Sequence, residues 1–203
     1  MTITELYVHL DLQVDSTSKI AILDDVARRC DEGYLFVDSD NGKMHLFDKC
    51  GNVDDINKVK SIGDNAFVSR KNLTSITIPD SVETIDAFAF WFCINLTSIT
   101  IPNSVKSIGN NVFYNCESLT SITIPNSVKD IGAGAFAYCK SLTNITIPDS
   151  VKDIGVNAFY GCTSLTSITF KNKTLNEVKS MSYYPWRIED ESIIKCNVAS
   201  SSH

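Results

Sequence analysis

A 23-residue phrase repeats along this chain, and it restricts the fold more than any other feature of the sequence. The phrase opens with Leu-Thr-Ser-Ile-Thr-Ile-Pro or a close variant of it. Its copies start at Leu73, Leu96, Leu119 and Leu142, and the beginning of a fifth copy starts at Leu165. A fixed period of roughly 20–30 residues is typical of a solenoid, in which each unit buries its apolar face against its neighbours. The sequence therefore predicts a stack of coils.

The first half of each repeat has the pattern of a β-strand. In the copy that starts at Leu96, Ile99 and Ile101 lie two residues apart with Thr100 between them. This alternation is typical of a strand that buries one face. Pro102 then ends the strand, because proline has no N–H to donate to a central ladder. Successive copies should therefore stack these strands into a parallel sheet.

The second half of each repeat returns the chain to its starting side. Val105 and Ile108 lie three apart and are expected to point inward. Gly109 permits a tight backbone bend, because glycine adopts positive φ without steric cost. Residues 110–116 are too short for an independent helix. We expect them to form one helical or 3₁₀ turn that closes the coil.

Stacking should place each residue above its equivalents in the neighbouring repeats. The inward aromatic column would contain Phe67, Phe90, Phe113, Phe136 and Phe159. A thiol column would contain Cys93, Cys116, Cys139 and Cys162. Buried free cysteine packs as a small apolar residue, and a 23-residue spacing does not form the CxxC pair of a zinc site. The sequence therefore predicts no metal site and no cofactor.

The repeat, written LxxIxIPxSVxxIGxxAFxxCxx, resembles the BspA-like or Treponema pallidum-type leucine-rich repeats. The resemblance covers residues 59–170. It implies an α/β solenoid, a short curved leucine-rich-repeat coil whose LTSITI strands form a parallel sheet on the concave side. Members of that family are mostly surface adhesins and host-protein binders, and the family offers no catalytic residues. The resemblance therefore implies a non-enzymatic protein-binding or adhesion module.

The remaining sequence divides into two ends. Residues 1–58 do not repeat, and we expect a strand at 5–14, a helix at 18–30 and a hairpin at 33–48 around an Asn-Gly pair. This order predicts a small N-terminal α/β cap. The solenoid should then extend over 59–170.

Residues 171–203 form the C-terminal end. Thr174 and Glu177 have the spacing of a capping box, which predicts a short helix through Met181. Residues 192–196 have the composition of a strand. We expect this helical segment to cover the open end of the solenoid, with an exposed Tyr/Trp contact patch as the alternative.

Charge and hydropathy exclude several partner classes. The net charge is −6, and residues 1–58 hold 12 acidic and 6 basic residues. Without a basic patch, nucleic acid and anionic membranes are poor partners. No apolar run approaches the ~18 residues of a membrane span, and no signal peptide is visible. These features predict a cytoplasmic or virion-associated protein unless a leader was removed, whereas the family resemblance implies the cell surface.

The sequence also argues against catalysis. Its three histidines are His9, His45 and His203, and they are scattered along the chain. No Ser-His-Asp set, HExxH, glycine-rich phosphate loop or carboxylate pair emerges. We therefore expect no enzymatic activity.

The best candidate for a partner site is where the repeats differ. Residues 86–95 read DAFAFWFCIN, whereas the next copy reads GNNVFYNCES at the equivalent positions. The candidate contact residues are Phe88, Trp91, Phe92, Tyr114, Tyr138 and Tyr160. Clustered surface aromatic residues are typical anchors of protein interfaces. The patch would bind a host or assembly protein or a second copy of this chain. Alternatively, Phe88, Trp91 and Phe92 dock the N-terminal cap.

The outward hydroxyls of the predicted strands are a weaker candidate on the concave face. They belong to Ser75, Thr77, Ser98, Thr100, Ser121, Thr123 and Thr146. Their small side chains hardly vary between copies, which is unusual for a specific site. The alternative function for the whole chain is a structural or assembly protein, such as a phage virion or tail component, or an intracellular adaptor that displays the solenoid.

Overall fold

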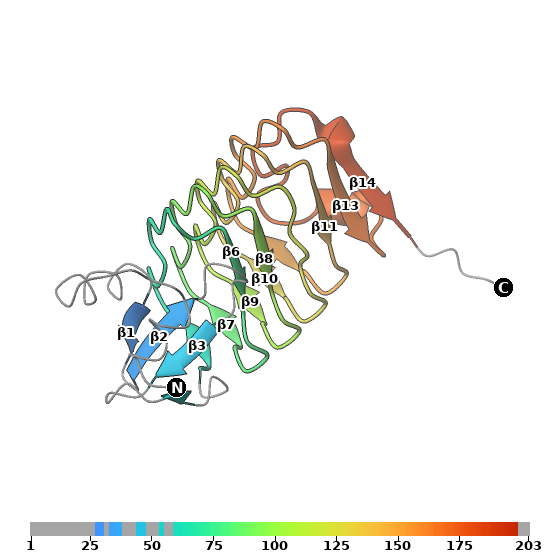
Figure 1. Ribbon diagram of the computed structural model, residues 1–203. Coiled ribbons are helices and arrows are strands. Elements are labelled where there is room, and N and C mark those ends of the chain that lie inside the picture. The colour runs from blue at the N-terminus through green and yellow to red at the C-terminus, as the bar shows by residue number, and fades with distance from the viewer. Residues whose placement is uncertain (1–26, 31–32, 38–43, 48–52, 55–58, 199–203) are drawn as a thin grey trace.

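The computed structural model of the 203-residue chain describes residues 59–198 in full (Figure 1). Before them it describes the backbone of four strands, β1 (Ala27–Cys30), β2 (Gly33–Val37), β3 (Met44–Phe47) and β4 (Val53–Asp54). These strands form an antiparallel sheet in the order β1-β2-β3-β4.

The predicted hairpin is confirmed, because β2 and β3 pair antiparallel with Val37 opposite Met44. The helix predicted over 18–30 is wrong at its C-terminal end, where β1 pairs with β2 and Ala27 lies opposite Phe36. There the cross-strand pairing overrides the helical spacing of the apolar residues. The rest of that helix, and the strand predicted at 5–14, lie outside the described residues.

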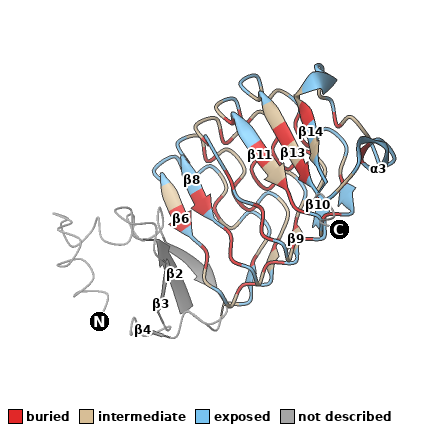
Figure 2. Cartoon of the chain, turned by 90° about the vertical axis from the view of Figure 1, so that its right-hand side faces the viewer, coloured by how far each residue is buried: buried red, intermediate tan, exposed pale blue. Residues whose placement is uncertain are grey.

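The repeats form a parallel β-solenoid of about 6 turns with little helix. We call each 23-residue turn a rung and number its positions from the leucine. The strands of the LTSITI half are β6 (Ser75–Thr77), β8 (Ser98–Thr100), β11 (Asn144–Ile147) and β13 (Ser167–Lys171). They lie in one row, with outward residues exposed or half-buried and inward isoleucines buried (Figure 2).

This sheet is less continuous than the sequence predicts. β6 pairs with β8 and β11 with β13, both parallel. The rung between these pairs contributes only a single bridge, from Thr123 to Thr146. The row is completed at its C-terminal end by β14 (Ile194–Asn197), which pairs with β13, so the strand predicted at 192–196 is confirmed from Ile194 onward.

A second parallel sheet, which the sequence pattern does not predict, runs through the second half of the repeats. Its strands are β5 (Ser61–Ile62), β7 (Thr84–Ile85), β9 (Ser107–Ile108), β10 (Asp130–Ile131) and β12 (Asp153–Ile154). They are hydrogen-bonded in the order β12-β10-β9-β7-β5. Each strand is only two residues long and buries its isoleucine. This second sheet is therefore continuous across five rungs, whereas the row of LTSITI strands is interrupted.

The predicted phenylalanine column is confirmed and forms the centre of the core. The rings of Phe67, Phe90 and Phe113 stack with centroids 5.1 and 5.5 Å apart. The column continues through Phe136 to Phe159, at 5.5 and 5.8 Å. All of these rings are buried. Near-parallel stacking follows from the exact repeat, because each ring adopts the orientation of the ring in the rung before it.

The segment that closes each rung, residues 110–116 in the rung of Leu96, is not the helical turn that we predicted. Its backbone is left-handed at positions 16 and 20, with φ between 54° and 72°. The left-handed residues are Asn65, Ser69, Phe88, Phe92, Asn111, Asn115, Gly134, Tyr138, Asn157 and Gly161. A continuous helix requires negative φ at every residue, so these two positions prevent one.

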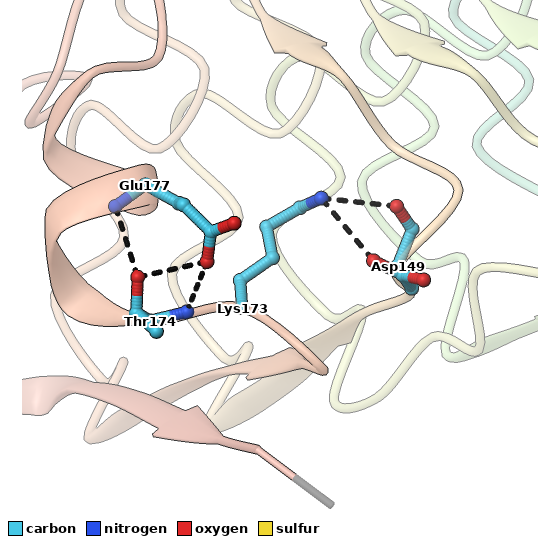
Figure 3. Close-up of polar contacts among 4 residues, drawn as sticks. All are labelled: Asp149, Lys173, Thr174 and Glu177. Carbon is cyan, nitrogen blue, oxygen red and sulfur yellow. Dashed lines mark hydrogen bonds and ion pairs between the residues drawn. The ribbon is translucent and has the colours of Figure 1, made fainter.

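The C-terminal segment contains the helix α3 (Leu175–Lys179) and the 3₁₀ helix η2 (Glu191–Ile193). The predicted capping box is confirmed: the Glu177 N–H donates to Thr174 Oγ1 and the Thr174 N–H to Glu177 Oε2, at 3.3 and 2.7 Å (Figure 3). The helix ends two residues before Met181. None of the helices in the described part of the chain combines the length and apolar character needed to cross a bilayer.

Two side chains attach this segment to the coil. Lys173 Nζ donates to the main-chain carbonyl of Asp149 at 3.0 Å and lies 3.5 Å from its Oδ1 (Figure 3). Trp186 is buried, its ring 6.5 Å from Phe159 and nearly perpendicular to it. The indole Nε1 donates to the carbonyl of Ser182 at 2.8 Å. Trp186 therefore ends the phenylalanine column.

Candidate functional site

Five of the six predicted aromatic contact residues form one line of touching rings, which we call the aromatic ridge. The ridge consists of Trp91, Phe92, Tyr114, Tyr138 and Tyr160. Trp91 and Phe92 are 4.2 Å apart between centroids, and both stack on Tyr114 at 6.3 and 6.0 Å. Edge-to-face contacts of 5.3 and 5.2 Å then link Tyr114 to Tyr138 and Tyr138 to Tyr160.

The hydrogen bonds between rungs position the ridge. The Phe92 N–H donates to the carbonyl of Tyr114 at 2.9 Å, and the Tyr138 N–H donates to that of Tyr160 at 2.6 Å. Between them, the Asn115 N–H donates to the Ala137 carbonyl at 2.8 Å. The ridge residues occupy positions 19 and 20 of successive rungs, so the stacking of the coil places one aromatic group above the next. These bonds fix the spacing between the ridge residues of adjacent rungs.

Two of the ridge residues adopt a backbone conformation that disfavours large side chains. Phe92 has φ 58° and Tyr138 has φ 59°. The equivalent position in the other described rungs is occupied by Ser69, Asn115 or Gly161. Left-handed backbone costs an ordinary residue about 1–2 kcal/mol, whereas glycine and asparagine tolerate it. Aromatic residues at these positions therefore carry a backbone conformational cost, which is typical of residues retained for another purpose.

Phe88, the sixth predicted residue, lies apart from the ridge. It also has φ 58° and is 37% exposed. No ring contact links it to another aromatic residue within 59–198. The alternative that Phe88, Trp91 and Phe92 dock the N-terminal cap depends on side chains of residues 1–58, which lie outside the described residues, and it stays a prediction.

The C-terminal end of the ridge carries a cationic neighbour that the sequence did not indicate. The Arg187 guanidinium lies over the Tyr160 ring, 5.6 Å from its centroid. Arg187 comes from the non-repeating segment, so no periodicity could place it on Tyr160. In the preceding rung, hydrogen bonding with the Tyr160 side chain raises the pKa of Tyr138. The Tyr138 phenol therefore stays protonated at physiological pH.

The predicted hydroxyl face is regular and exposed. Ser98, Thr100 and Thr123 are exposed, and Ser75 and Thr146 are half-buried. The flanking position-2 threonines use their hydroxyls within the scaffold. Thr97 Oγ1 donates to the carbonyl of Thr74 at 2.9 Å, and Thr166 Oγ1 donates to that of Thr143 at 3.1 Å. This face therefore offers repeated small groups without an aromatic anchor.

The thiol column takes part in structure. Its cysteines are unpaired, and each thiol donates to the carbonyl of the phenylalanine one rung earlier, over 2.9 to 3.2 Å. Burial raises the pKa of Cys93 and Cys162 to about 12 and that of Cys116 and Cys139 well above its usual range. A protonated thiol is neither a nucleophile nor a metal ligand. Within the described residues, no three His, Cys, Asp or Glu side chains are grouped to hold a metal ion.

Comparison with protein families supports the repeat assignment. A family model described as a BspA-type leucine-rich repeat region, in 6 copies, matches residues 43–155. No curated protein matches the chain. The family resemblance derived from the sequence is therefore confirmed by a model that covers more than half of the chain.

Solved structures of the same architecture are similar to this chain. A leucine-rich repeat protein of T. pallidum is 28% identical, with a TM-score of 0.54, over 66% of this chain and 67% of its own. One from Bacteroides ovatus ATCC 8483 is 29% identical, with a TM-score of 0.52, over 71% of this chain and 49% of its own. The pneumococcal vaccine antigen PcpA shares the fold, at 21% identity and a TM-score of 0.50, over 75% and 38%. This chain thus spans about half of the Bacteroides protein and less of PcpA.

Proposed function

This chain belongs to the BspA-type leucine-rich repeat family, and we propose that it is a non-enzymatic module that binds a protein partner through the aromatic ridge. The observation that carries the proposal is the ring contact from Trp91 to Tyr160 across four rungs. Tryptophan and tyrosine are the residues that most often dominate interface energetics. Their amphipathic rings bury a large area while the phenol hydroxyls retain hydrogen-bonding capacity.

Backbone strain supports this proposal independently of ring contact. Phe92 and Tyr138 occupy left-handed positions where asparagine or glycine would give a more stable rung. A purely structural role does not account for that choice, because other rungs fold with the smaller residues. Partner recognition does account for it, since only an aromatic residue supplies an anchor.

A second part of the proposal concerns the two ends of the solenoid. We propose that residues 1–58 and residues 171–203 act as caps. For the C-terminal segment, support comes from the burial of Trp186 against Phe159 and from β14, which extends the row of LTSITI strands. Terminal segments of solenoids commonly shield the apolar interior that stacking leaves open.

Photo-crosslinking tests whether the ridge contacts a partner. The photoreactive residue p-benzoylphenylalanine replaces Tyr114 at the centre of the ridge, and a matched variant carries it in place of Thr100 on the hydroxyl face. Each variant is irradiated with a panel of purified candidate proteins and, separately, alone. We expect covalent adducts with one partner from position 114 and few from position 100.

The other outcomes separate the alternatives. A covalent homodimer from position 114 in the protein alone would replace the external partner by a second copy and would favour the assembly function. Adducts from position 100 without adducts from position 114 would reject the ridge as the binding site and would favour the hydroxyl face instead.

A further inference from the structure

In each rung, three main-chain N–H groups of the closing segment donate hydrogen bonds to carbonyls of the next rung. In the rung of Leu119, the N–H groups of Gly134 and Phe136 donate to the carbonyls of Val156 and Ala158, each at 2.9 Å. The Tyr138 N–H donates to Tyr160 in the same way. The same three positions, 16, 18 and 20, donate forward in every earlier described rung. The coil therefore requires three carbonyl acceptors beyond each closing segment.

The last complete rung lacks these acceptors. Its equivalent donors are the N–H groups of Asn157, Phe159 and Gly161. Among the described residues, none accepts a hydrogen bond from these three groups. The next turn of the chain, residues 182–188, resembles a closing segment, because Tyr183 and Arg187 are left-handed, but its carbonyls do not accept hydrogen bonds from these three groups. Unpaired N–H groups at alternate positions are a template for pairing with another chain.

This end of the closing segments is also open to solvent. In the preceding rung Gly134 and Cys139 are buried, whereas at the same positions Asn157 is exposed and Cys162 is only half-buried. Two exposed apolar side chains lie beside the free donors. Val156 is 43% exposed and Tyr183 is 65% exposed. The C-terminal segment thus covers the core through Trp186 but not this edge.

Two hollows lie between the last closing segment and the C-terminal segment. One, of about 490 Å³, lies between residues 159–166 and 187–193. The other, of about 550 Å³, lies between residues 156–160 and 183–189. Tyr160, Arg187, Ile188 and Glu189 line both hollows, so the two hollows are adjacent and together form one groove.

The charges of the groove indicate what it would accept. Glu189 lines both hollows, is exposed and has no partner among the described residues. Asp190 lines the first hollow and accepts from the Ser192 N–H. Arg187, the cation of the groove, lies over Tyr160. A basic side chain would complement this acidic wall.

We propose that this edge groove, formed by residues 156–163 and 183–190, binds an extended segment of a partner protein as one additional rung. The segment's carbonyls accept from the N–H groups of Asn157, Phe159 and Gly161. It presents an apolar or aromatic side chain to the hollow beside Tyr160 and a lysine or arginine to Glu189. This is strand addition to an open edge, in which the main chain supplies affinity and side-chain pockets supply selectivity. The groove adjoins the ridge at Tyr160, but the inference does not depend on the ridge binding anything.

Amide hydrogen exchange followed by NMR on the full chain tests the first half of the proposal. We expect the N–H groups of Asn157 and Gly161 to exchange rapidly, and their paired equivalents, Gly134 and Tyr138, to exchange slowly. Equal protection of both sets in the free protein would overturn the proposal, because the donors would then already be satisfied.

Peptides selected from a phage-displayed random library against the immobilised protein test the second half. We expect selected peptides to combine an apolar or aromatic residue with a nearby lysine or arginine, and to slow exchange at Asn157, Phe159 and Gly161. Peptides that bind without protecting these amides, or a library that yields no binder, would overturn the proposal that the groove binds an extended segment.

Variants identify the side chains responsible. Tyr183→Ala and Glu189→Lys should each weaken the selected peptide about tenfold or more. The matched charge reversal Asp130→Lys, on β10, should leave its affinity unchanged. Trp91→Ala should also leave it unchanged, so a failure of the ridge proposal and a failure of the groove are distinguishable. Equal loss in Asp130→Lys and Glu189→Lys would reject a specific role for the acidic wall.

Discussion

The thiol of Cys116 donates a 3.2 Å hydrogen bond to the main-chain carbonyl of Phe90, which lies one rung earlier. The same contact joins Cys139 to Phe113 at 3.2 Å, so it is a property of the repeat. Each sulfur fills space beside the phenylalanine column and also ties adjacent rungs together. In the first described rung this position is occupied by Arg70, which marks that rung as atypical.

Removal of one of these thiols should weaken the coil measurably. Cys139→Ala deletes a buried sulfur and its hydrogen bond, and we expect it to lower the free energy of unfolding by about 1–2 kcal/mol. Cys162→Ala makes the same change at the half-buried end of the column and should cost less. Chemical denaturation measures both variants. Equal losses would mean that burial does not govern the contribution of the thiol.

Thiol chemistry should depend on pH in a defined direction. Burial raises the pKa of Cys93 and Cys162 to about 12, above the unfolded value of 9.0. The neutral thiols therefore stabilise the fold fully below pH 9, and this contribution decreases as the pH rises from 9 toward 12. We expect the melting temperature to fall over that interval, as followed by circular dichroism.

Residue-resolved alkylation provides a second readout of the same burial. At pH 8.5, mass spectrometry should find Cys116 and Cys139 unmodified in the native protein, with Cys196 reacting faster, since Cys196 is only half-buried. Reaction of Cys116 at the rate of the unfolded chain would contradict the packing of the column.

Phe88→Asn should stabilise the protein. Phe88 is exposed and left-handed, so asparagine should relieve about 1 kcal/mol of backbone strain while it keeps the N–H bond to Asn110. The reciprocal change, Asn111→Phe at the same position of the next rung, should destabilise by a similar amount. Chemical denaturation gives both values. A loss of stability in Phe88→Asn would mean that Phe88 packs against a partner surface such as the N-terminal cap.

Trp91→Ala should separate binding from folding. As a ridge anchor, Trp91 should contribute about 2–3 kcal/mol to partner binding, which corresponds to roughly a 30- to 150-fold weaker Kd. Because the side chain is only half-buried, we expect the loss of unfolding free energy to stay below about 2 kcal/mol. Biolayer interferometry with the crosslinked partner measures the first quantity, with Thr100→Ala as control. Unchanged affinity would exclude Trp91 from the interface.

Trp186→Ala should damage the end of the solenoid. Trp186 is fully buried between Phe159, Phe170 and Tyr184. Its truncation should cost about 3–5 kcal/mol and expose the last phenylalanine of the column to apolar dyes. The nearby exposed Tyr183→Ala should change stability by less than about 0.5 kcal/mol. A small effect of Trp186→Ala would contradict its role as a cap.

The phenylalanine column was predictable because a strict repeat places equal residues above one another, whatever the path between them. The second ladder was not predictable from periodicity, because a two-residue strand such as Ser107–Ile108 contains a single apolar residue. The sequence of the closing segment does indicate its backbone conformation. Asn111 and Asn115 lie four residues apart, and asparagine tolerates left-handed backbone, so this pair argues against the helical turn that we predicted.

The ridge was largely predictable for the same reason as the column, since Trp91, Tyr114 and Tyr160 share one repeat position. Two features escaped the pattern. Phe88 stands alone because position 16 carries no aromatic residue in other rungs. Arg187 reaches Tyr160 from outside the repeat, and only the three-dimensional path of the C-terminal segment brings the two together.

Because the N–H groups of each closing segment donate to the following rung, the two ends of the coil differ. The same pattern allows the number of rungs to change. Every described closing segment before the last has the same geometry and makes the same three bonds, so a copy inserted between the rungs of Leu96 and Leu119 would find hydrogen-bond partners on both sides. Such an insertion would lengthen the protein by one strand spacing, about 4.8 Å, and leave both ends chemically unchanged. The number of repeats therefore sets the distance between the first rung of the coil and the C-terminal groove.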